Sequence, residues 1–233
     1  HAKGVTETMR VKNRMTPNPI VATPKTNYNE ALRLMQQNHI KQLPIVDAND
    51  KLVGIVTQGD MLRAEPSPVT TLSVYEIASL LEKVTMAKIM TSPVLAVDES
   101  CSITNAANFM LSNDIDCLPV VRNDKLIGII TDTDIFKTFV EITGGTQSGS
   151  HIEARMPNQK GKLAPFIQAL TNADSYIVSV TISYEDSGNY GVVDVKERGG
   201  DEAKIQAELK KLDNVEIVSF RPSDDDKVLK FGK

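Results

Sequence analysis

Residues 15–60 read MTPNPIVATPKTNYNEALRLMQQNHIKQLPIVDANDKLVGIVTQGD, and residues 90–134 read MTSPVLAVDESCSITNAANFMLSNDIDCLPVVRNDKLIGIITDTD. The two stretches match in register. Met15 and Thr16 correspond to Met90 and Thr91, and after a one-residue contraction NDKLVGIVT corresponds to NDKLIGIIT. Chance does not produce such agreement over so long a span. The chain therefore contains a duplicated unit. An internal repeat of this kind is a stronger indicator of the overall architecture than any single predicted helix or strand.

Each copy has the same internal order of strand, helix, strand, strand and helix. A short apolar run opens it, at Ile20–Ala22 and again at Val94–Val97. A helical pattern follows, and then two apolar runs separated by a polar turn, which is typical of a hairpin. A unit of this size buries too little apolar surface to be stable alone. We therefore expect the copies to pack sheet to sheet around a shared core, with a pseudo-twofold axis and two equivalent clefts.

The segment between the copies has its own apolar pattern. Pro66 and Pro68 precede a helix expected over Ser73–Lys83. Its apolar side chains fall on one face, which we expect to lie against the pair; they are Val74, Ile77, Ala78, Leu80 and Leu81.

A third unit is expected after Gly144–Ser150, which by composition is a flexible linker. The patterns there predict strands at His151–Arg155, Ile177–Tyr184, Tyr190–Val195 and Val215–Phe220, with helices at Leu163–Leu170 and Glu202–Leu212. This βαββαβ order is ferredoxin-like. The fold class is thus α/β (α+β): a pair of repeats with pseudo-twofold symmetry followed by a smaller sandwich of helices on a sheet.

Composition narrows the classes of function. The 233 residues carry 26 basic and 30 acidic side chains and no tryptophan. A mildly acidic chain lacks the dense basic field that nucleic acid requires, so nucleic acid is not an expected partner. No apolar run is long enough for a membrane helix, so no membrane partner is expected. Only Cys101 and Cys117 are present, which fits a reduced cytoplasm and offers no metal site.

The sharpest local pattern is Thr57-x-x-Asp60, repeated as Thr131-x-x-Asp134, at a strand-to-helix turn. One interpretation is a capping box, in which threonine and aspartate close the helix N-terminus. The other is a ligand site. A helix N-terminus attracts phosphate, and a carboxylate suits paired ribose hydroxyls, so threonine with aspartate suits a ribose phosphate. The small apolar strand starts would then hold a purine between them.

At these residues the chain resembles a tandem pair of cystathionine-β-synthase (CBS) domains. The segments GIVTQGD and GIITDTD resemble the ribose-binding signature of that family, and MTPNP, MTSPV and the Leu-Pro strands resemble its other landmarks. The resemblance implies a cleft ligand with an adenosyl group, AMP, ADP or ATP, and no catalytic cofactor. The residues it implies for ribose and phosphate are Thr57, Asp60, Thr131 and Asp134, with base contacts from the strand starts at Ile20, Ala22, Val94 and Ala96 of the same or the opposite repeat. His39 is a further candidate for phosphate contact, with a surface histidine as the alternative, and Lys41 and Arg63 are candidates to neutralise phosphate.

Residues 151–222 resemble an ACT domain, a class that often dimerises and sometimes binds an amino acid. The resemblance rests on Pro157-x-x-x-Gly161-Lys162-Leu163, where glycine lets a ligand or a neighbouring chain approach closely. It implies an amino-acid loop that includes Asn158, Gly161 and Leu163. A CBS pair followed by an ACT domain is similar to the AcuB-like family of acetoin utilisation.

Together these features predict a non-catalytic regulator, not an enzyme. An adenine nucleotide would shift the pair between two states and bias an unknown regulated protein, and the chain itself would form a homodimer in the cytoplasm. The alternatives are a structural dimerisation module without nucleotide and an amino-acid sensor. The expected segments are a tag remnant at 1–8, repeats at 9–64 and 85–140, a connecting helix at 65–84, a linker at 141–150, the ACT-like domain at 151–222 and an acidic flexible tail at 223–233.

Overall fold

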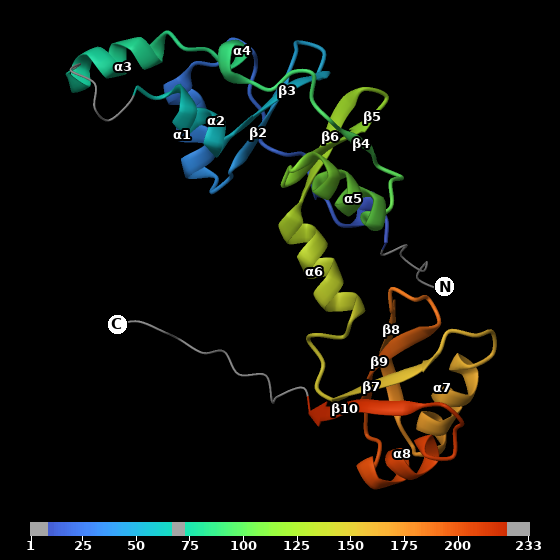
Figure 1. Ribbon diagram of the computed structural model, residues 1–233. Coiled ribbons are helices and arrows are strands. Elements are labelled where there is room, and N and C mark those ends of the chain that lie inside the picture. Colours follow the sequence, from blue (N-terminus) through green and yellow to red (C-terminus); the bar gives the residue numbers. More distant parts are fainter. Residues whose placement is uncertain (1–8, 67–72, 223–233) are drawn as a thin grey trace, which may run out of the picture. The chain divides into compact units, whose positions relative to one another are not determined.

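A computed structural model describes residues 9–66 and 73–222 (Figure 1). The expected tag remnant, the expected acidic tail and Pro68 lie outside the described residues. The chain divides between Phe136 and Lys137 into two compact units, which are described separately below.

The first unit holds both repeats, and each repeat begins with a short helical turn. The first contains η1 (Val11–Asn13), β1 (Thr16–Pro17), α1 (Tyr28–Gln37), β2 (Gln42–Val46), β3 (Leu52–Thr57) and α2 (Gln58–Ala64). The second contains α4 (Met86–Ile89), β4 (Val97–Asp98), α5 (Ile103–Asn113), β5 (Cys117–Arg122), β6 (Lys125–Thr131) and α6 (Asp132–Ile142), which continues beyond the unit boundary. The predicted helix–strand–strand–helix order is therefore confirmed in both copies.

The opening strands are shorter than expected. Only Ala22 pairs in the first copy, in a single parallel bridge to Ile45. In the second copy only Val97 and Asp98 form a strand, parallel to β5. Pro19 and Pro24 flank the first segment, and proline supplies no N–H to a strand ladder. The predicted strand at Ile20–Ala22 is therefore reduced to one residue, and most of Val94–Val97 is extended chain.

The two repeats exchange their Met-Thr segments. Thr16 of the first copy pairs with Ile129 in β6, and Thr91 of the second pairs with Ile55 in β3. Beside each pairing lies a glycine against the methionine of the other copy: a Cβ at Gly54 would overlap the sulfur of Met90, and one at Gly128 that of Met15. The hairpins also meet at their turns, where Lys51 bridges to Lys125 and its ammonium lies 3.3 Å from the Asp124 carboxylate.

Buried apolar side chains form one core in each repeat and a smaller cluster between them. Met35, Leu43, Ile45, Val56 and Met61 belong to the first core. The second core has the equivalent set, including Met110, Leu118, Val120 and Ile130. The cluster between the repeats consists of Ile55, Cys117 and Ile129 with Val94 beside them. Instead of the single shared core that the duplication predicted, each repeat has its own core, and only the small cluster joins the two.

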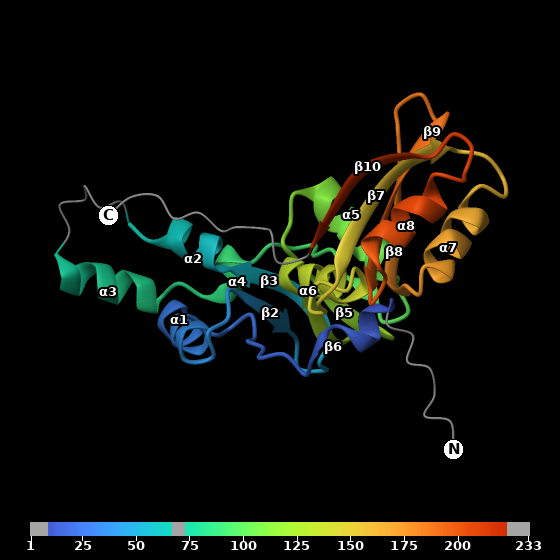
Figure 2. The same ribbon diagram turned by 90° about the horizontal axis from the view of Figure 1, so that it is seen from below.

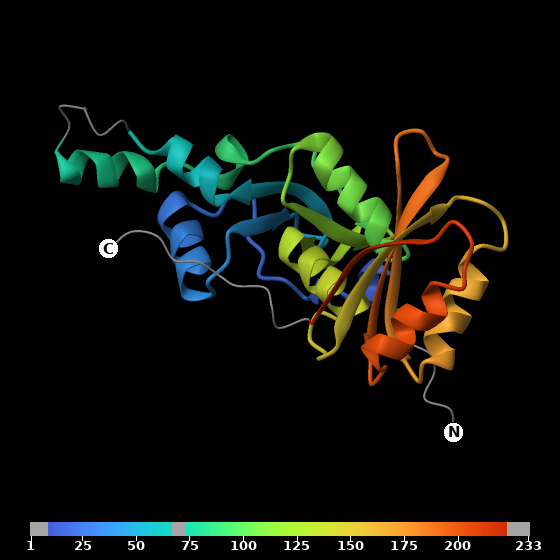
Figure 3. The ribbon, with the colours of Figure 1, turned by 60° about the horizontal axis from the view of Figure 1, so that its bottom comes forward.

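The connecting helix α3 (Val74–Glu82) begins at a Ser73–Glu76 capping box, close to the predicted start. Its expected apolar face is only partly covered. Ile77 and Leu81 are half-buried, and Leu81 packs against the first core, but Ala78 is exposed and Leu80 is 49% exposed. The prediction that this whole face lies against the pair is thus wrong for Ala78 and Leu80, because a single helix edge contacts the core beside α1 (Figures 1 and 3).

The second unit is a four-stranded antiparallel sheet with two helices on one face (Figures 2 and 3). Its elements are β7 (Ser150–Pro157), α7 (Leu163–Asn172), β8 (Tyr176–Tyr184), β9 (Tyr190–Arg198), α8 (Glu202–Leu209) and β10 (Glu216–Pro222). The strand order β10-β7-β9-β8 is that of a ferredoxin-like βαββαβ fold, as predicted. Alternate residues of β7 and β9 face the helices and are buried, among them Ile152, Ala154, Val193 and Val195.

Several element ends differ from the expected ones, and two of these differences concern α8 and the linker. α8 ends at Leu209 instead of Leu212, and the next residues form tight turns in which Leu212 N–H donates to the Leu209 carbonyl. The expected linker is partly ordered. α6 runs to Ile142, and Ser179 donates to the Thr143 carbonyl at 2.9 Å. A Cβ at Gly144 would overlap Val178, and its φ of +68° favours glycine, so this turn packs on the second unit.

Candidate functional site

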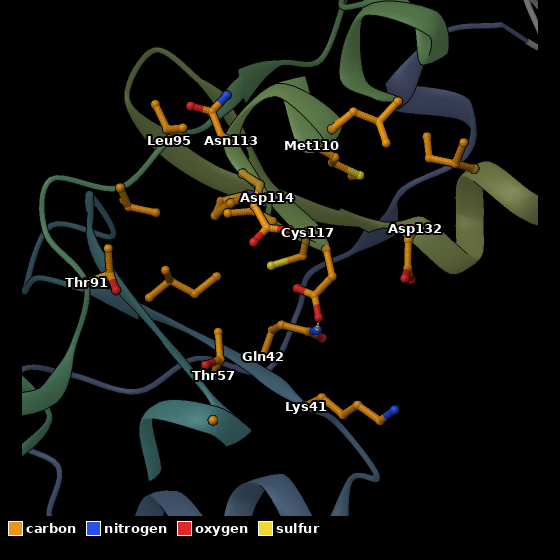
Figure 4. A pocket seen from close by; sticks show the side chains of 18 of the residues that line it. Lys41, Gln42, Thr57, Thr91, Leu95, Met110, Asn113, Asp114, Cys117 and Asp132 are labelled. Carbon is orange, nitrogen blue, oxygen red and sulfur yellow. Dashed lines mark hydrogen bonds between the residues drawn. The ribbon is translucent and has the colours of Figure 1, made fainter. Parts of the chain in front are cut away.

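The first unit contains a pocket of about 1000 Å³ lined by both repeats. Figure 4 shows Lys41, Gln42 and Thr57 from the first repeat facing Asn113, Asp114 and Asp132 from the second. Its position follows from the fold, because the loop after each Met-Thr segment crosses to the other copy. A pocket lined by two packed modules is a common place for a small-molecule site.

Part of the pocket lining is apolar. Its apolar residues include Ile55, Val94, Leu95, Met110 and Pro119. In Figure 4 Asn113 lies beside Leu95, and Cys117 lies in the middle of the view, so polar and apolar groups alternate along the lining. Val94 packs beside the buried cluster that joins the repeats. These side chains offer apolar contact to a flat ring, and the polar groups interspersed among them can fix its orientation.

The Thr57-x-x-Asp60 turn forms a complete capping box at the start of α2. The Asp60 carboxylate accepts hydrogen bonds from the N–H and the hydroxyl of Thr57, both at 2.7 Å, and Asp60 N–H donates to the Thr57 hydroxyl at 3.2 Å. The guanidinium of Arg63, one turn later, pairs with the other carboxylate oxygen. The capping interpretation is therefore realised in the structure, and Asp60 is held in a fixed position.

The second copy reproduces the two hydrogen bonds from threonine to the aspartate carboxylate. The Asp134 carboxylate accepts from Thr131 N–H at 2.9 Å and from the Thr131 hydroxyl at 3.0 Å. The position of Arg63 is occupied by Lys137, and the two residues after threonine are Asp132 and Thr133 instead of Gln58 and Gly59. The two helix starts are thus alike in capping and different in charge.

The structure brings together only some of the predicted nucleotide-binding residues. Thr57 and Val94 line the same pocket from opposite repeats, and Lys41 lies at its rim. Seven others are not among the residues that line this pocket in the described part of the chain: Asp60, Thr131, Asp134, Ile20, Ala22, Ala96 and His39.

The surroundings of these residues explain their placement. Asp60 directly follows the lining residue Gly59, and Asp134 directly precedes the lining residue Ile135, but both carboxylates form hydrogen bonds within their helix caps. Ala22 is 4% exposed and packs in the first core. Ala96 and His39 are exposed, and His39 has a left-handed backbone just after α1.

Sequence reasoning missed the polar rim contributed by the second repeat. Asp116 accepts a hydrogen bond from the Gln42 amide at 3.0 Å, which joins the repeats across the pocket. Asp114 ends α5 with a left-handed backbone. A signal was available: Gln42 lies one position before Leu43-Pro44, and Asp116 lies two positions before Leu118-Pro119. Their proximity, however, depends on how the copies pack.

Cys117 gives the pocket a measurable probe. The side chain is buried, and burial together with the neighbouring Asp116 raises the pKa of the Cys117 thiol to about 12. Because the thiolate is the reactive form, we expect iodoacetamide to modify Cys117 at pH 8 at least ~100-fold more slowly than in the unfolded chain. Mass spectrometry after timed labelling in buffer and in urea tests this, and equal rates would contradict the placement of Cys117.

The raised pKa of Cys117 also makes the stability of the folded chain depend on pH. A raised folded-state pKa gives stability that is complete below the unfolded-state pKa and is lost as the pH rises through the folded value. Cys117 therefore favours folding at neutral pH, and this contribution falls above about pH 9.

The second unit carries a smaller hollow of about 540 Å³ beside α7. Gly161 and Leu163 of the predicted amino-acid loop line it, together with Ala164, Ile167 and Thr171. Gly161 has a φ of +88°, and a Cβ there would meet nothing within 4 Å. Asn158 does not line the hollow in the described residues; its amide donates to the Gly188 carbonyl at 3.0 Å and holds two loops together.

Known proteins resemble the first unit. The family model of the CBS domain matches residues 11–67 and 86–141. An acetoin utilization protein (AcuB) crystal structure from Vibrio cholerae is 35% identical, with a TM-score of 0.48, over 57% of this chain and 90% of that one. CBSX2, whose crystal structure contains AMP, is 31% identical, with a TM-score of 0.49, over 57% of this chain and 98% of that one.

A curated relative, an uncharacterised protein of Methanocaldococcus jannaschii, is 33% identical over 58% of this chain and 33% of its own length. The chain spans a third to about half of the length of the first curated relatives it matches. Both repeats match the family model, and their exchanged segments form one unit, so the chain belongs to the proteins that carry a tandem pair of CBS domains.

The described residues hold neither an apolar helix of membrane-spanning length nor a cluster of metal ligands. None of the described helices combines the length and apolar character needed to cross a bilayer. No group of three or more histidine, cysteine, aspartate or glutamate side chains in the described part of the chain is placed to hold a metal ion.

Proposed function

We propose that the protein is a non-catalytic regulator that binds an adenosyl ligand, AMP, ADP or ATP or a related compound, in the pocket between its CBS repeats. One observation carries the proposal: Thr57, at the start of a capped helix, and the apolar residues Val94 and Leu95 line one pocket from opposite repeats. In the proposed binding mode a purine contacts Val94 and Leu95, and the ribose lies toward the Thr57 turn. AMP in the crystal structure of CBSX2, a relative of the first unit, supports this ligand class.

The cap of α2 gives the proposed ligand a means to act. Asp60 already accepts from the Thr57 hydroxyl, so a ribose that binds Asp60 must exchange with that hydroxyl or share the carboxylate. Either change alters the start of α2 while the ligand contacts the opposite repeat. A ligand shifts an equilibrium only by its differential affinity for two states, and a contact that spans both repeats provides such a difference.

The wider role is part of the same proposal. The regulated protein is unidentified, the chain acts as a homodimer in the cytoplasm, and the second unit is an ACT domain that relays the signal. Similarity to the AcuB structure supports a place in acetoin utilisation. A second candidate, an amino-acid sensor, is favoured by one observation: the hollow beside Gly161 and Leu163. The third candidate is a structural dimerisation module in which both Thr-x-x-Asp turns only cap helices.

A thermal-shift series separates these functions. The full chain is heated with adenosine, AMP, ADP, ATP, S-adenosylmethionine or each of the common amino acids. A ligand at about 100 times its Kd stabilises by ~2.7 kcal/mol, which at this size raises the Tm by roughly 5–10 °C. We expect such a rise with at least one adenine compound. A rise with amino acids alone would support the sensor in the second unit, and no rise at all would support the structural module.

A further inference from the structure

The pocket between the repeats has an uneven charge. Among the described residues that line it, Lys41 is the single basic side chain, whereas Asp114, Asp116 and Asp132 are acidic. The lysine belongs to the first repeat and the three aspartates to the second (Figure 4). Thus a ligand in this pocket meets more negative than positive charge.

Two of the three carboxylates have neutral hydrogen-bond partners. Asp116 accepts from the uncharged amide of Gln42 at 3.0 Å, and Asp132 accepts from the N–H and the hydroxyl of Thr133. No ion pair between described residues includes any of the three. Asp60 differs, because Arg63 compensates it. Hydrogen bonds from neutral donors hold a carboxylate in place without removing its charge, so its field extends into the pocket.

This charge disfavours a chain of phosphates. A pocket that binds a triphosphate usually supplies several basic side chains or a metal ion, because each phosphate brings negative charge. Here Lys41 is the one basic group, and it is exposed. The same three carboxylates would attract a positively charged group placed where a phosphate would otherwise lie. Because the three side chains are exposed to solvent, this attraction and repulsion are moderate and weaken as the salt concentration rises.

We propose that this pocket selects adenosyl ligands by charge, and that it prefers a 5′ substituent that is neutral or positive, such as the sulfonium of S-adenosylmethionine, over a polyphosphate. This inference rests on the proposed function and specifies its ligand class. Asp116 and Asp132 are the specificity-determining residues: they repel phosphate and attract the cation. Lys41 alone compensates no more than one unit of negative charge.

Calorimetry on the full chain with matched ligands tests the proposal. Two comparisons are made without divalent cations, at 20 mM and at 500 mM salt. The first is the series adenosine, AMP, ADP and ATP; the second is S-adenosylmethionine against S-adenosylhomocysteine, which lacks the sulfonium methyl and its charge. At low salt we expect ATP to bind at least about tenfold more weakly than S-adenosylmethionine, and the sulfonium compound to bind better than its neutral analogue. Both differences should shrink at high salt.

Variants assign the effect to the named residues. The double variant Asp116→Asn, Asp132→Asn keeps hydrogen-bond acceptors at both positions and removes two charges. It should reduce the preference for S-adenosylmethionine over ATP by about tenfold, mainly through tighter ATP binding. Asp50→Asn, at an exposed turn outside the pocket, is the matched control and should leave the ratio unchanged. If the double variant misfolds, each single variant and the salt series of the parent chain still decide the question.

The outcomes separate the two proposals. ATP that binds as tightly as S-adenosylmethionine at both salt concentrations would overturn the charge selection and leave the proposed function intact. A ratio that is the same in parent and double variant would also overturn it. Binding of no adenine compound would overturn the proposed function, and the charge selection with it.

Discussion

Replacing Gly128 with valine is expected to lower the Tm of the CBS pair by about 6–12 °C. A Cβ at Gly128 would overlap the sulfur of Met15, which reaches it from the other repeat, and valine adds two more methyl groups. Overpacking of this kind costs about 3 kcal/mol, and one kcal/mol corresponds to ~2–4 °C at this size. Valine favours strands, so the loss would come from the clash and not from the backbone. Differential scanning calorimetry measures it.

The equivalent glycine of the first repeat, Gly54, offers a control. Gly54→Val should behave alike, because Met90 lies against Gly54 as Met15 lies against Gly128. Met15→Ala should therefore rescue part of the stability of Gly128→Val and none of that of Gly54→Val, and Met90→Ala should do the opposite. We expect coupling energies of roughly 1–3 kcal/mol within each matched pair and near zero across pairs. Coupling of equal size in all four double variants would show that the two exchanges are not separate contacts.

Asp60→Ala is expected to weaken binding of adenosyl ligands at least ~30-fold, and Asp134→Ala to do the same in any site that uses the second turn. Alanine removes the carboxylate that suits ribose hydroxyls and releases Thr57, a pocket residue, from the position in which two hydrogen bonds hold it. A loss of two charge-assisted hydrogen bonds accounts for this size. Calorimetric titration with adenosine and AMP measures it.

The helix cap lost in these variants needs its own control. Removing a cap costs about 1 kcal/mol and lowers the Tm slightly in either variant. α3 begins with an equivalent capping box, in which Ser73 and Glu76 bond reciprocally. Glu76→Ala removes this cap far from the pocket lining, so it should lower stability by a similar amount and leave binding unchanged. Asp60→Ala that binds AMP like the parent chain would refute the ribose assignment and leave only the cap.

Local chemistry predicted the elements that depend on neighbours in sequence. The Thr-x-x-Asp turns form caps, the hairpins form at their polar turns, and the βαββαβ order of the second unit gives the expected sheet. In each of these, a few adjacent side chains and one periodic pattern settle the structure. The second unit is therefore as readable as the first, although it contains no repeat.

The sequence predicted that the copies pack together, but not which residues meet across them. The pattern predicted clefts at each repeat, but the pocket combines Thr57 with Val94, Asp116 and Cys117 of the other repeat. Ala22 had the small apolar side chain expected beside a purine, yet a single bridge to Ile45 turns it into the core. A shift of one residue in the strand register decides which side of a short strand faces a pocket. The strand propensities of the residues carry no information about that register.

The crossing of the Met-Thr segments has a consequence for the history of the chain. Each repeat supplies the methionine that lies against the other's glycine, and neither holds both members of a pair. An ancestral chain with one copy could make these contacts only in a dimer, with its Met-Thr segment packed against the glycine of a second molecule. Duplication and fusion would have turned that exchange between molecules into one within a single polypeptide, where it no longer depends on concentration. Only after that fusion could the two halves diverge, as the acidic rim of the second copy has.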